Sequence, residues 1–297
     1  MAIRSSRVAL ALAGALILGL GTVSITPIVH AQDATPVMVA PPQDLLPPAE
    51  MEAEGQTAEI NGVDIYYEVY GEGNGDPVIL IHGGLSNGDH FVNQIPVLAE
   101  NHEVVVMDSR GHGRSSFDDT PISYAVMAED VLGLMDHLGI DKASIVGWSD
   151  GGIIGLDIAI HHPERLIKLI AYGANYIPAG VRTDVGDSER FNAYIEMAAG
   201  DYVRLSPTPD GFDAFLNNIG NMWATEPNYT PEQMGSITVP TLILDGLEEE
   251  AIYTEHALEM AHLIPTADLF LMSNIGHFAM FDKADEFNHI VLDYLGR

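Results

Sequence analysis

The sequence predicts a doubly wound α/β fold with a mostly parallel sheet, and three observations lead to this fold class. Short apolar runs alternate with longer helical patterns along most of the chain. Two of these runs, 77–81 and 103–107, are apolar at nearly every position, which is typical of strands covered on both faces. A Gly-x-Ser-x-Gly pentapeptide also lies where one such run gives way to a helical pattern. In sheets of this kind ligands bind beyond the carboxyl ends of the strands, so we expect the chemistry there.

The first 56 residues do not belong to this pattern. Two arginines precede an apolar run and small residues follow it, so residues 1–31 are predicted to be a secretory signal peptide. A retained membrane anchor is the alternative, although glycines and a threonine interrupt the run. Residues 32–56 are rich in proline and poor in large apolar side chains, which predicts a disordered linker. One domain at 57–297 remains, and the leader predicts a secreted or periplasmic protein with no stable membrane insertion after cleavage.

The chain is strongly acidic, with a formal net charge of −31. Such a surface repels nucleic acid and anionic lipid, so we expect neither as a partner and expect a small-molecule substrate instead. The sequence contains no cysteine, which excludes disulfides, thiolate metal sites and a cysteine nucleophile. No cofactor is expected. Oxygen ligands in the acidic loop 245–250 would suit calcium, but their spacing does not match an EF-hand, so no metal is expected either.

The secondary-structure elements are expected in a regular order. Residues 63–70 alternate as an antiparallel edge strand does. Core strands are expected at 77–81, 103–107, 143–147, 166–171, 241–244 and 269–271. Helices are expected at about 89–99, 122–138, 152–160 and 282–294. The segment from about 178 to 236 breaks this rhythm, because it is helical in pattern and rich in aromatic residues and methionine. We interpret it as a helical lid, inserted before the acid-bearing strand at 241–244 and placed to cover the site.

The pentapeptide Gly147-Trp148-Ser149-Asp150-Gly151 is the central functional signal. A serine on a sharp strand-to-helix turn is held in a strained backbone conformation with its hydroxyl exposed. Small residues are needed two positions before and after it, because side chains there would collide with the neighbouring strand and helix. The helix that follows presents unpaired N–H groups where an oxyanion would form. Ser149 is therefore the candidate nucleophile.

A serine nucleophile needs a base, an acid that orients the base, and donors for the oxyanion. His277 follows the last predicted strand and is the candidate base. The acid is expected between Ser149 and His277 in the chain, and the loop 245–250 offers four carboxylates, most of them interpreted as solvated charge. Glycines after His82 let the backbone turn an N–H towards the serine. His82 itself and the turn at 108–115 are expected to be structural.

Taken together, five motifs resemble the α/β-hydrolase fold family, in its lid-bearing branch of small esterases, lactonases, C–C hydrolases and perhydrolases. They lie at 82–84, 108–113, 147–152, 240–246 and 276–278, and the resemblance extends over about residues 58–295. It implies that Ser149 is the nucleophile and His277 the base. It also implies that the backbone N–H groups of Gly84 and Asp150 donate to the oxyanion.

The triad acid is where the chain departs from the family pattern. The family motif G-x-x-D after the acid-bearing strand places the acid at Glu249, where glutamate replaces the usual aspartate. Because a glutamate orients the imidazole in some members of the family, the resemblance still implies activity. Glu248 and Asp245 remain alternatives.

The elbow and residues 171–175 resemble more narrowly the valacyclovirase-like (biphenyl-hydrolase-related) esterases. In those enzymes an acid near the nucleophile helps to hold a substrate ammonium group. Asp150 either does the same here or only complements the positive end of the helix, and we favour the second interpretation. Trp148, Asp150 and Trp223 are the residues expected to bind substrate.

The predicted function is therefore that of a serine hydrolase, which cleaves carboxylic esters of small, partly apolar substrates through an acyl-enzyme. Two alternatives remain open. The first is an enol-lactone or C–C bond hydrolase with the same triad, and the second is a non-catalytic, ligand-binding homologue. A serine at the elbow argues against the dehalogenase and epoxide-hydrolase branches of the family, which have aspartate there.

Overall fold

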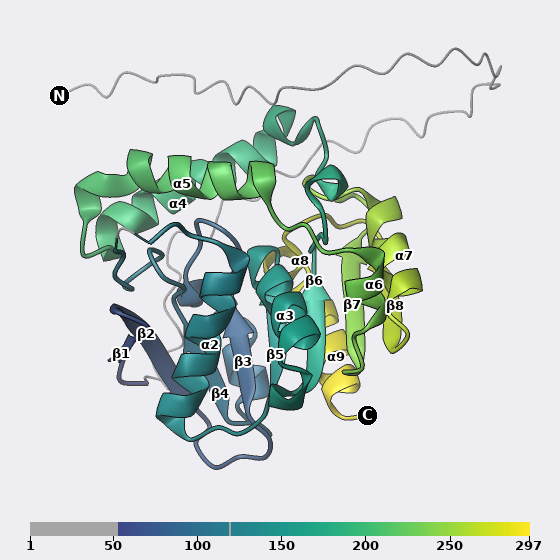
Figure 1. The fold of residues 1–297 in the computed structure, drawn as a ribbon, viewed down its shortest axis with the longest axis horizontal. Helices are drawn as coiled ribbons and strands as arrows, with labels where there is room; N and C mark the ends of the chain where they lie inside the picture. The colour runs from purple at the N-terminus through teal and green to yellow at the C-terminus, as the bar shows by residue number, and fades with distance from the viewer. Residues whose placement is uncertain (1–52, 119) are drawn as a thin grey trace. The chain divides into compact units, whose positions relative to one another are not determined.

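A single eight-stranded sheet is the centre of the structure, a computed structural model that describes residues 53–118 and 120–297 (Figure 1). The strands are β1 (Gln56–Ile60), β2 (Val63–Tyr70), β3 (Val78–Ile81), β4 (Val104–Met107), β5 (Ala143–Trp148), β6 (Leu166–Tyr172), β7 (Thr241–Gly246) and β8 (Ala267–Met272). Their order in the sheet is β1-β2-β4-β3-β5-β6-β7-β8. β2 pairs antiparallel with β1 and β4, and the other six strands, β3 to β8, are parallel to one another. This is the doubly wound, mostly parallel sheet that the sequence predicts.

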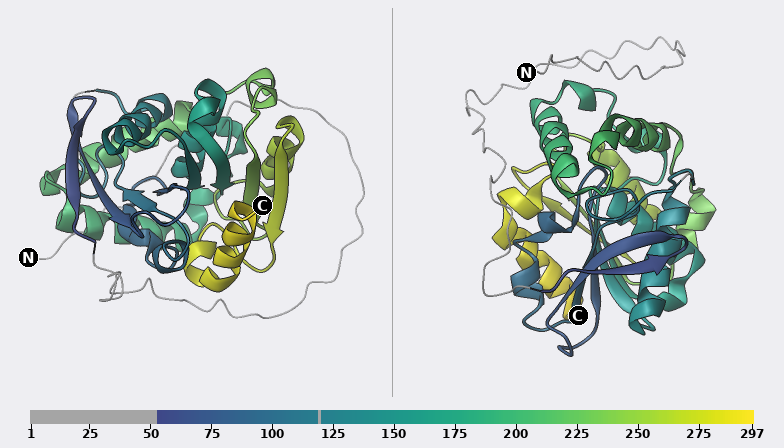
Figure 2. Two further views of the ribbon diagram at one scale, coloured as in Figure 1. Left: turned by 90° about the horizontal axis from the view of Figure 1, so that it is seen from below. Right: turned by 90° about the vertical axis from the view of Figure 1, so that its left-hand side faces the viewer.

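Helices cover both faces of this sheet (Figure 2). They include α2 (Tyr124–Leu138), α3 (Asp150–His161) and α7 (Thr254–Leu263) in one apolar core, with α1 (Ile95–Leu98) and α9 (Ala284–Leu295) in the other. Successive β3 side chains alternate between the two cores, as the pleat requires: Ile79 and Ile81 enter the first, Val78 and Leu80 the second. The continuous apolar run in the sequence therefore reflects burial on both faces.

One predicted helix is broken in the structure. The segment 89–99 forms a 3₁₀ turn, η1 (Gly88–Phe91), followed by the short α1. Pro96 lies in the first turn of α1, and its missing N–H prevents a helix from running through it. The helix predicted at 282–294 is present as α9, and the short α8 (Ala279–Asp282) precedes it.

The segment 178–236, which we call the helical insertion, lies between β6 and β7. It contains α4 (Glu189–Leu205), α5 (Phe212–Thr225) and α6 (Pro231–Gly235). Figure 1 shows α4 and α5 lying side by side across one end of the sheet. Their amphipathic faces bury Tyr194, Phe215 and Met222.

The predicted signal peptide lies outside the described residues, as does the predicted linker up to residue 52. Gln56, predicted to be the last residue of the linker, instead begins β1. Within residues 53–118 and 120–297, no helix is long and apolar enough to cross a membrane.

Candidate active site

Ser149 occupies a strained turn between β5 and α3. Its φ of 54° and ψ of −117° lie in a region that residues with a side chain rarely adopt. The turn is held by the backbone, because the Ser149 N–H donates to the carbonyl of Tyr172 at 2.7 Å. A Cβ on Gly147 would lie 2.2 Å from the carbonyl oxygen of Gly151, and one on Gly151 would lie 2.0 Å from that of Ile81. The predicted strain and the need for small flanking residues are both confirmed.

His277 lies in the loop after β8, where its ring contacts the carboxylate of Glu249. The distance from His277 Nδ1 to Glu249 Oε1 is 2.7 Å, and both side chains are buried. The ring N–H is not aimed directly at that oxygen, because Nδ1 has no well-aligned hydrogen-bond partner among the described residues. Catalytic hydrogen bonds are often poorly aligned before substrate binds, so this geometry remains compatible with a base–acid pair. Burial alone would lower the pKa of His277, but the contact with the charged Glu249 and the charges of Glu250 and Asp150 together outweigh burial, so the pKa is raised.

Glu249 is held as an anion in spite of its burial. Its Oε1 accepts hydrogen bonds from the backbone N–H groups of Ala251 at 2.7 Å and Ile252 at 3.1 Å. Burial raises the pKa of this carboxyl, but the positive charge on His277 and these N–H groups more than offset the burial, so that the pKa is lowered. Glu249 is thus ionised and directed at His277.

The acidic loop after β7 corrects one prediction. We expected most of its carboxylates to be solvated charge, but only Glu248 is exposed. Asp245 and Glu249 are buried, at 1% and 4% exposure. Glu250 accepts the backbone N–H of His277 at 2.6 Å. Backbone donors at the strand ends satisfy one carboxyl oxygen of each of these acids, which a sequence pattern does not reveal. Among the three candidates for the triad acid, only Glu249 is in contact with His277.

The two predicted oxyanion donors lie beside Ser149. A Cβ on Gly83 would lie 3.1 Å from the Ser149 Cβ, which places the loop after β3 against the elbow. The N–H of Gly84 has no backbone acceptor among the described residues. Asp150 is the first residue of α3, so its N–H has no partner within the helix. These two N–H groups are therefore the candidates to stabilise an oxyanion.

The Asp150 side chain links the elbow to the helical insertion. Its carboxylate accepts a hydrogen bond from the Tyr124 hydroxyl at 2.9 Å and one from Trp223 Nε1 at 3.0 Å. Burial raises the pKa of Asp150 to about 6, and the two donors only partly offset it. A substrate ammonium group would have to compete with these donors. Asp150 and Trp223 were both predicted to bind substrate, and in the structure they are hydrogen-bonded to each other.

Trp148 is placed differently from our expectation. Its indole is 1% exposed and packs among the rings of Tyr194, His277 and Phe278. Its Nε1 donates to the carbonyl of His277 at 2.9 Å. The pentapeptide alone does not tell on which side of β5 this residue lies. The structure gives Trp148 a packing role behind His277 in place of the predicted substrate contact.

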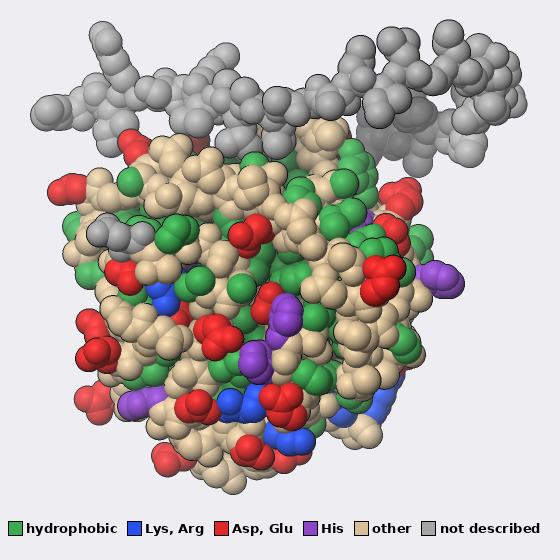
Figure 3. Space-filling view, viewed as in Figure 1, with side chains coloured by type: hydrophobic (Ala, Val, Ile, Leu, Met, Phe, Trp, Pro, Cys, Tyr) green, Lys and Arg blue, Asp and Glu red, His purple; other side chains and the backbone are tan. Residues whose placement is uncertain are grey.

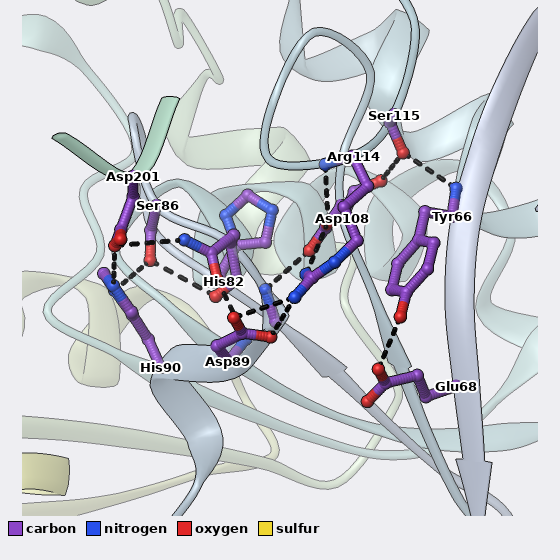
Figure 4. A network of polar contacts seen from close by, with 12 residues as sticks. Tyr66, Glu68, His82, Ser86, Asp89, His90, Asp108, Arg114, Ser115 and Asp201 are labelled. Carbon is purple, nitrogen blue, oxygen red and sulfur yellow. Dashed lines mark hydrogen bonds and ion pairs between the residues drawn. The ribbon is translucent and has the colours of Figure 1, made fainter. Parts of the chain in front are cut away.

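A polar network next to the loop after β3 was not predicted from the sequence (Figure 4). His90 lies between Ser86 and Asp201, with Nδ1 2.5 Å from Ser86 Oγ and Nε2 3.1 Å from Asp201 Oδ2. Asp201 belongs to α4, so this chain of contacts ties the helical insertion to the loop after β3. No local pattern signals it, because His90 and Asp201 are 111 residues apart.

Beside this network, the predicted structural residues are confirmed as such. His82 Nε2 accepts the N–H of Ser109 at 2.9 Å. The buried Asp108 accepts the N–H groups of Gly88 at 2.7 Å and Arg114 at 2.8 Å. No cluster of three or more potential metal ligands occurs among the described residues.

The comparisons with known proteins agree with this architecture. Residues 76–204 match the family model of the alpha/beta hydrolase fold. The chain is 29% identical over 264 residues to a 2-hydroxy-6-oxo-6-phenylhexa-2,4-dienoate hydrolase of Comamonas testosteroni, covering 78% of this chain and 91% of that protein. It is 29% identical over 249 residues to the serine hydrolase BPHL of Mus musculus, covering 80% and 84%. The solved structure of Est816, described as an N-acyl homoserine lactone degrading enzyme, has a TM-score of 0.65 and 28% identity and covers 80% of this chain and 99% of its own. With the sheet and the elbow described above, these matches show that the chain has the α/β-hydrolase fold.

Proposed function

We propose that the protein is a serine hydrolase that cleaves small, uncharged carboxylic esters, lactones included, through an acyl-enzyme. The observation that carries this proposal is the 2.7 Å contact between His277 Nδ1 and Glu249 Oε1 at the same strand ends as the strained Ser149. A buried, ionised acid behind an imidazole makes the ring a stronger base, which a serine hydroxyl requires.

The reaction would proceed in two steps. Ser149 Oγ attacks the ester carbonyl carbon as its proton passes to His277, and the carbonyl electron pair moves onto oxygen. The N–H groups of Gly84 and Asp150 stabilise this oxyanion, while Glu249 stabilises the imidazolium. When the oxyanion collapses, the bond to the alcohol breaks and the alcohol takes the proton from His277. Water then repeats the sequence on the acyl-enzyme and releases the carboxylic acid and free Ser149.

The charges around the site favour an uncharged substrate. The helical insertion contains three arginines, and each is already ion-paired: Arg182 with Asp184, Arg190 with Glu250 and Asp282, and Arg204 with Asp201. Figure 3 shows acidic side chains spread over one face of the molecule, in line with the net charge of −31. An anionic substrate would therefore approach a negative surface and find no unpaired arginine on the insertion.

Hydrolysis of a C–C bond is the second candidate. The name of the Comamonas testosteroni relative supports it, since that protein acts on a dienoate with the same fold. The paired arginines argue against it, because a dienoate is a carboxylate anion. A substrate panel separates the two candidates.

The test is hydrolysis of three substrate sets by the purified protein: short p-nitrophenyl esters, simple lactones and a 2-hydroxy-6-oxo-dienoate. We expect the esters and lactones to be turned over, and Ser149→Ala to lower kcat by about 10⁴-fold or more. Fluorophosphonate should label the wild type and not this variant. Turnover of the dienoate alone would support the second candidate, and absence of labelling would indicate a ligand-binding homologue.

The pH profile gives a second test. His277 must be neutral to accept the serine proton, and its pKa is raised by Glu249. Activity should therefore be present above that pKa and fall as the pH drops through it. The midpoint of this fall is expected to be higher than the ordinary histidine value of about 6.5.

A further inference from the structure

Two buried carboxyl oxygens after β7 lack a hydrogen-bond partner among the described residues. They are Oδ2 of Asp245 and Oε2 of Glu249. The second oxygen of each group is satisfied, since Asp245 Oδ1 accepts the N–H of Gly246 at 2.8 Å and Glu249 Oε1 accepts two backbone N–H groups. Buried polar atoms without a partner are rare and costly, so the two oxygens call for an explanation.

No basic side chain of the described residues is among the groups that act on Asp245. The ionisable groups that act on it are Glu249 and Glu250 from its own loop, while Tyr172 faces it from β6. Two adjacent carboxylates in a buried site cannot both be ionised at low cost, and such pairs hold one proton between them. A proton on Oδ2 of Asp245 would give Oε2 of Glu249 a donor, and both unpartnered atoms would be satisfied.

The surroundings decide which carboxyl carries this proton. Glu249 faces His277 and accepts two backbone N–H groups, which favour its charged form. Burial and the charge of Glu249 raise the pKa of Asp245 well above its ordinary value, whereas the pKa of Glu249 is lowered. The proton therefore belongs on Asp245.

We propose that Asp245 is a positioning residue, whose protonated carboxyl donates a hydrogen bond to Oε2 of Glu249 and so orients that acid towards His277. The catalytic part of this inference rests on the proposed hydrolase function. Asp245 touches neither substrate nor the reacting atoms and acts only through Glu249. This hydrogen bond also stabilises the Glu249 anion. Glu249 is then a weaker hydrogen-bond acceptor for His277 and raises the pKa of His277 less than it would alone.

The catalytic test compares two substitutions of matched shape. Asp245→Asn keeps a donor for Glu249, and Asp245→Leu keeps the branching of the side chain but has no polar atom. We expect Asp245→Asn to retain kcat within about threefold, and Asp245→Leu to lower kcat by about 10- to 100-fold with KM nearly unchanged. In the leucine variant the acid limb of the kcat/KM profile should also move to higher pH, because Glu249 becomes a stronger acceptor. Equal kcat values and equal pH profiles for the two variants would overturn the proposal.

An infrared measurement tests the shared proton without substrate. At about pH 8, Asp108 and Asp150 are ionised, since the pKa of each is about 6, whereas Asp245 should still show the carbonyl band of a protonated acid. This band should disappear in Asp245→Asn. Its persistence in that variant, or its absence from the wild type, would contradict the proposal even if the leucine variant failed to fold. A wild type that keeps the band but hydrolyses no ester would leave the shared proton standing and refute only the proposed function.

Discussion

The triad region and the helical insertion are held in place by different kinds of bond. At the strand ends backbone N–H groups position the side chains: the Ser149 N–H donates to the carbonyl of Tyr172, and two backbone N–H groups donate to Glu249. Helices α4 and α5 of the insertion are attached by side chains, through Trp223 to Asp150 and through Asp201 to His90, whereas the backbone bonds to the rest of the chain lie near the two ends of the insertion, such as that of Arg182 to Ala251. The fold thus presets the geometry of the proposed triad, whereas the attachment of α4 and α5 depends on a few replaceable side chains. This division suits a family in which one chemistry serves many substrates.

The largest effect should come from the triad acid. Glu249→Gln removes the charge that stabilises the His277 imidazolium, so we expect kcat to fall by about 10³- to 10⁴-fold. The matched control is Glu248→Gln, because Glu248 lies in the same loop but is exposed. Its kcat should equal that of the wild type in the same ester assay. Equal losses in the two variants would show that the loop as a whole, and not the contact with His277, supports activity.

Glycine substitutions compare the two regions in stability. A Cβ on Gly151 would lie 2.0 Å from the carbonyl of Ile81, so Gly151→Ala should lower the free energy of unfolding by about 1–3 kcal/mol. Gly200 lies in α4, and a Cβ there meets nothing within 4 Å. Gly200→Ala should therefore raise the free energy of unfolding by about 0.5–1 kcal/mol. Urea denaturation of both variants measures the contrast, and a destabilised Gly200→Ala would mean that the insertion is packed as tightly as the elbow.

The same contrast explains what the sequence could predict. The elbow and His277 could be predicted because each follows a recognisable strand, and the carboxyl ends of parallel strands lie at the same edge of the sheet. The burial of Asp245 was not readable, because four carboxylates in six residues look alike until backbone donors are placed around them. Trp148 was assigned to substrate because a pentapeptide does not tell which side chains turn inward.

Longer-range links were beyond any local pattern. Trp223 and Asp150 are 73 residues apart, and their bond depends on how α5 crosses the sheet end. The break near Pro96, in contrast, has a local signal as well, because proline lacks an N–H for a continuous helix. The apolar spacing of 89–99 favours a helix, but buried polar bonds, such as those of Gln94 to Met280 and Asn288, hold the segment in shorter turns.

The last test concerns Asp150, a carboxylate that joins the elbow to the helical insertion. Burial raises the pKa of Asp150 from 3.8 to about 6, so the folded protein binds this proton more tightly than the unfolded chain does. Between these two pKa values the folded state holds more protons than the unfolded state, so lowering the pH stabilises the folded state. From about pH 7 to about pH 5, Asp150 should add about 1 kcal/mol to the free energy of unfolding of the wild type.

Asp150→Asn provides the control for this pH effect, because its side chain cannot ionise but its oxygen can still accept the Trp223 N–H. Asp108, whose pKa is also raised to about 6 by burial, titrates equally in both proteins. The difference between wild type and variant in urea denaturation therefore reports on Asp150 together with the part of the His277 titration that the Asp150 charge shifts. A difference that is the same at both pH values would mean that this carboxylate is solvated when folded, and that the insertion lies more loosely over the elbow than the hydrogen bonds of Asp150 indicate.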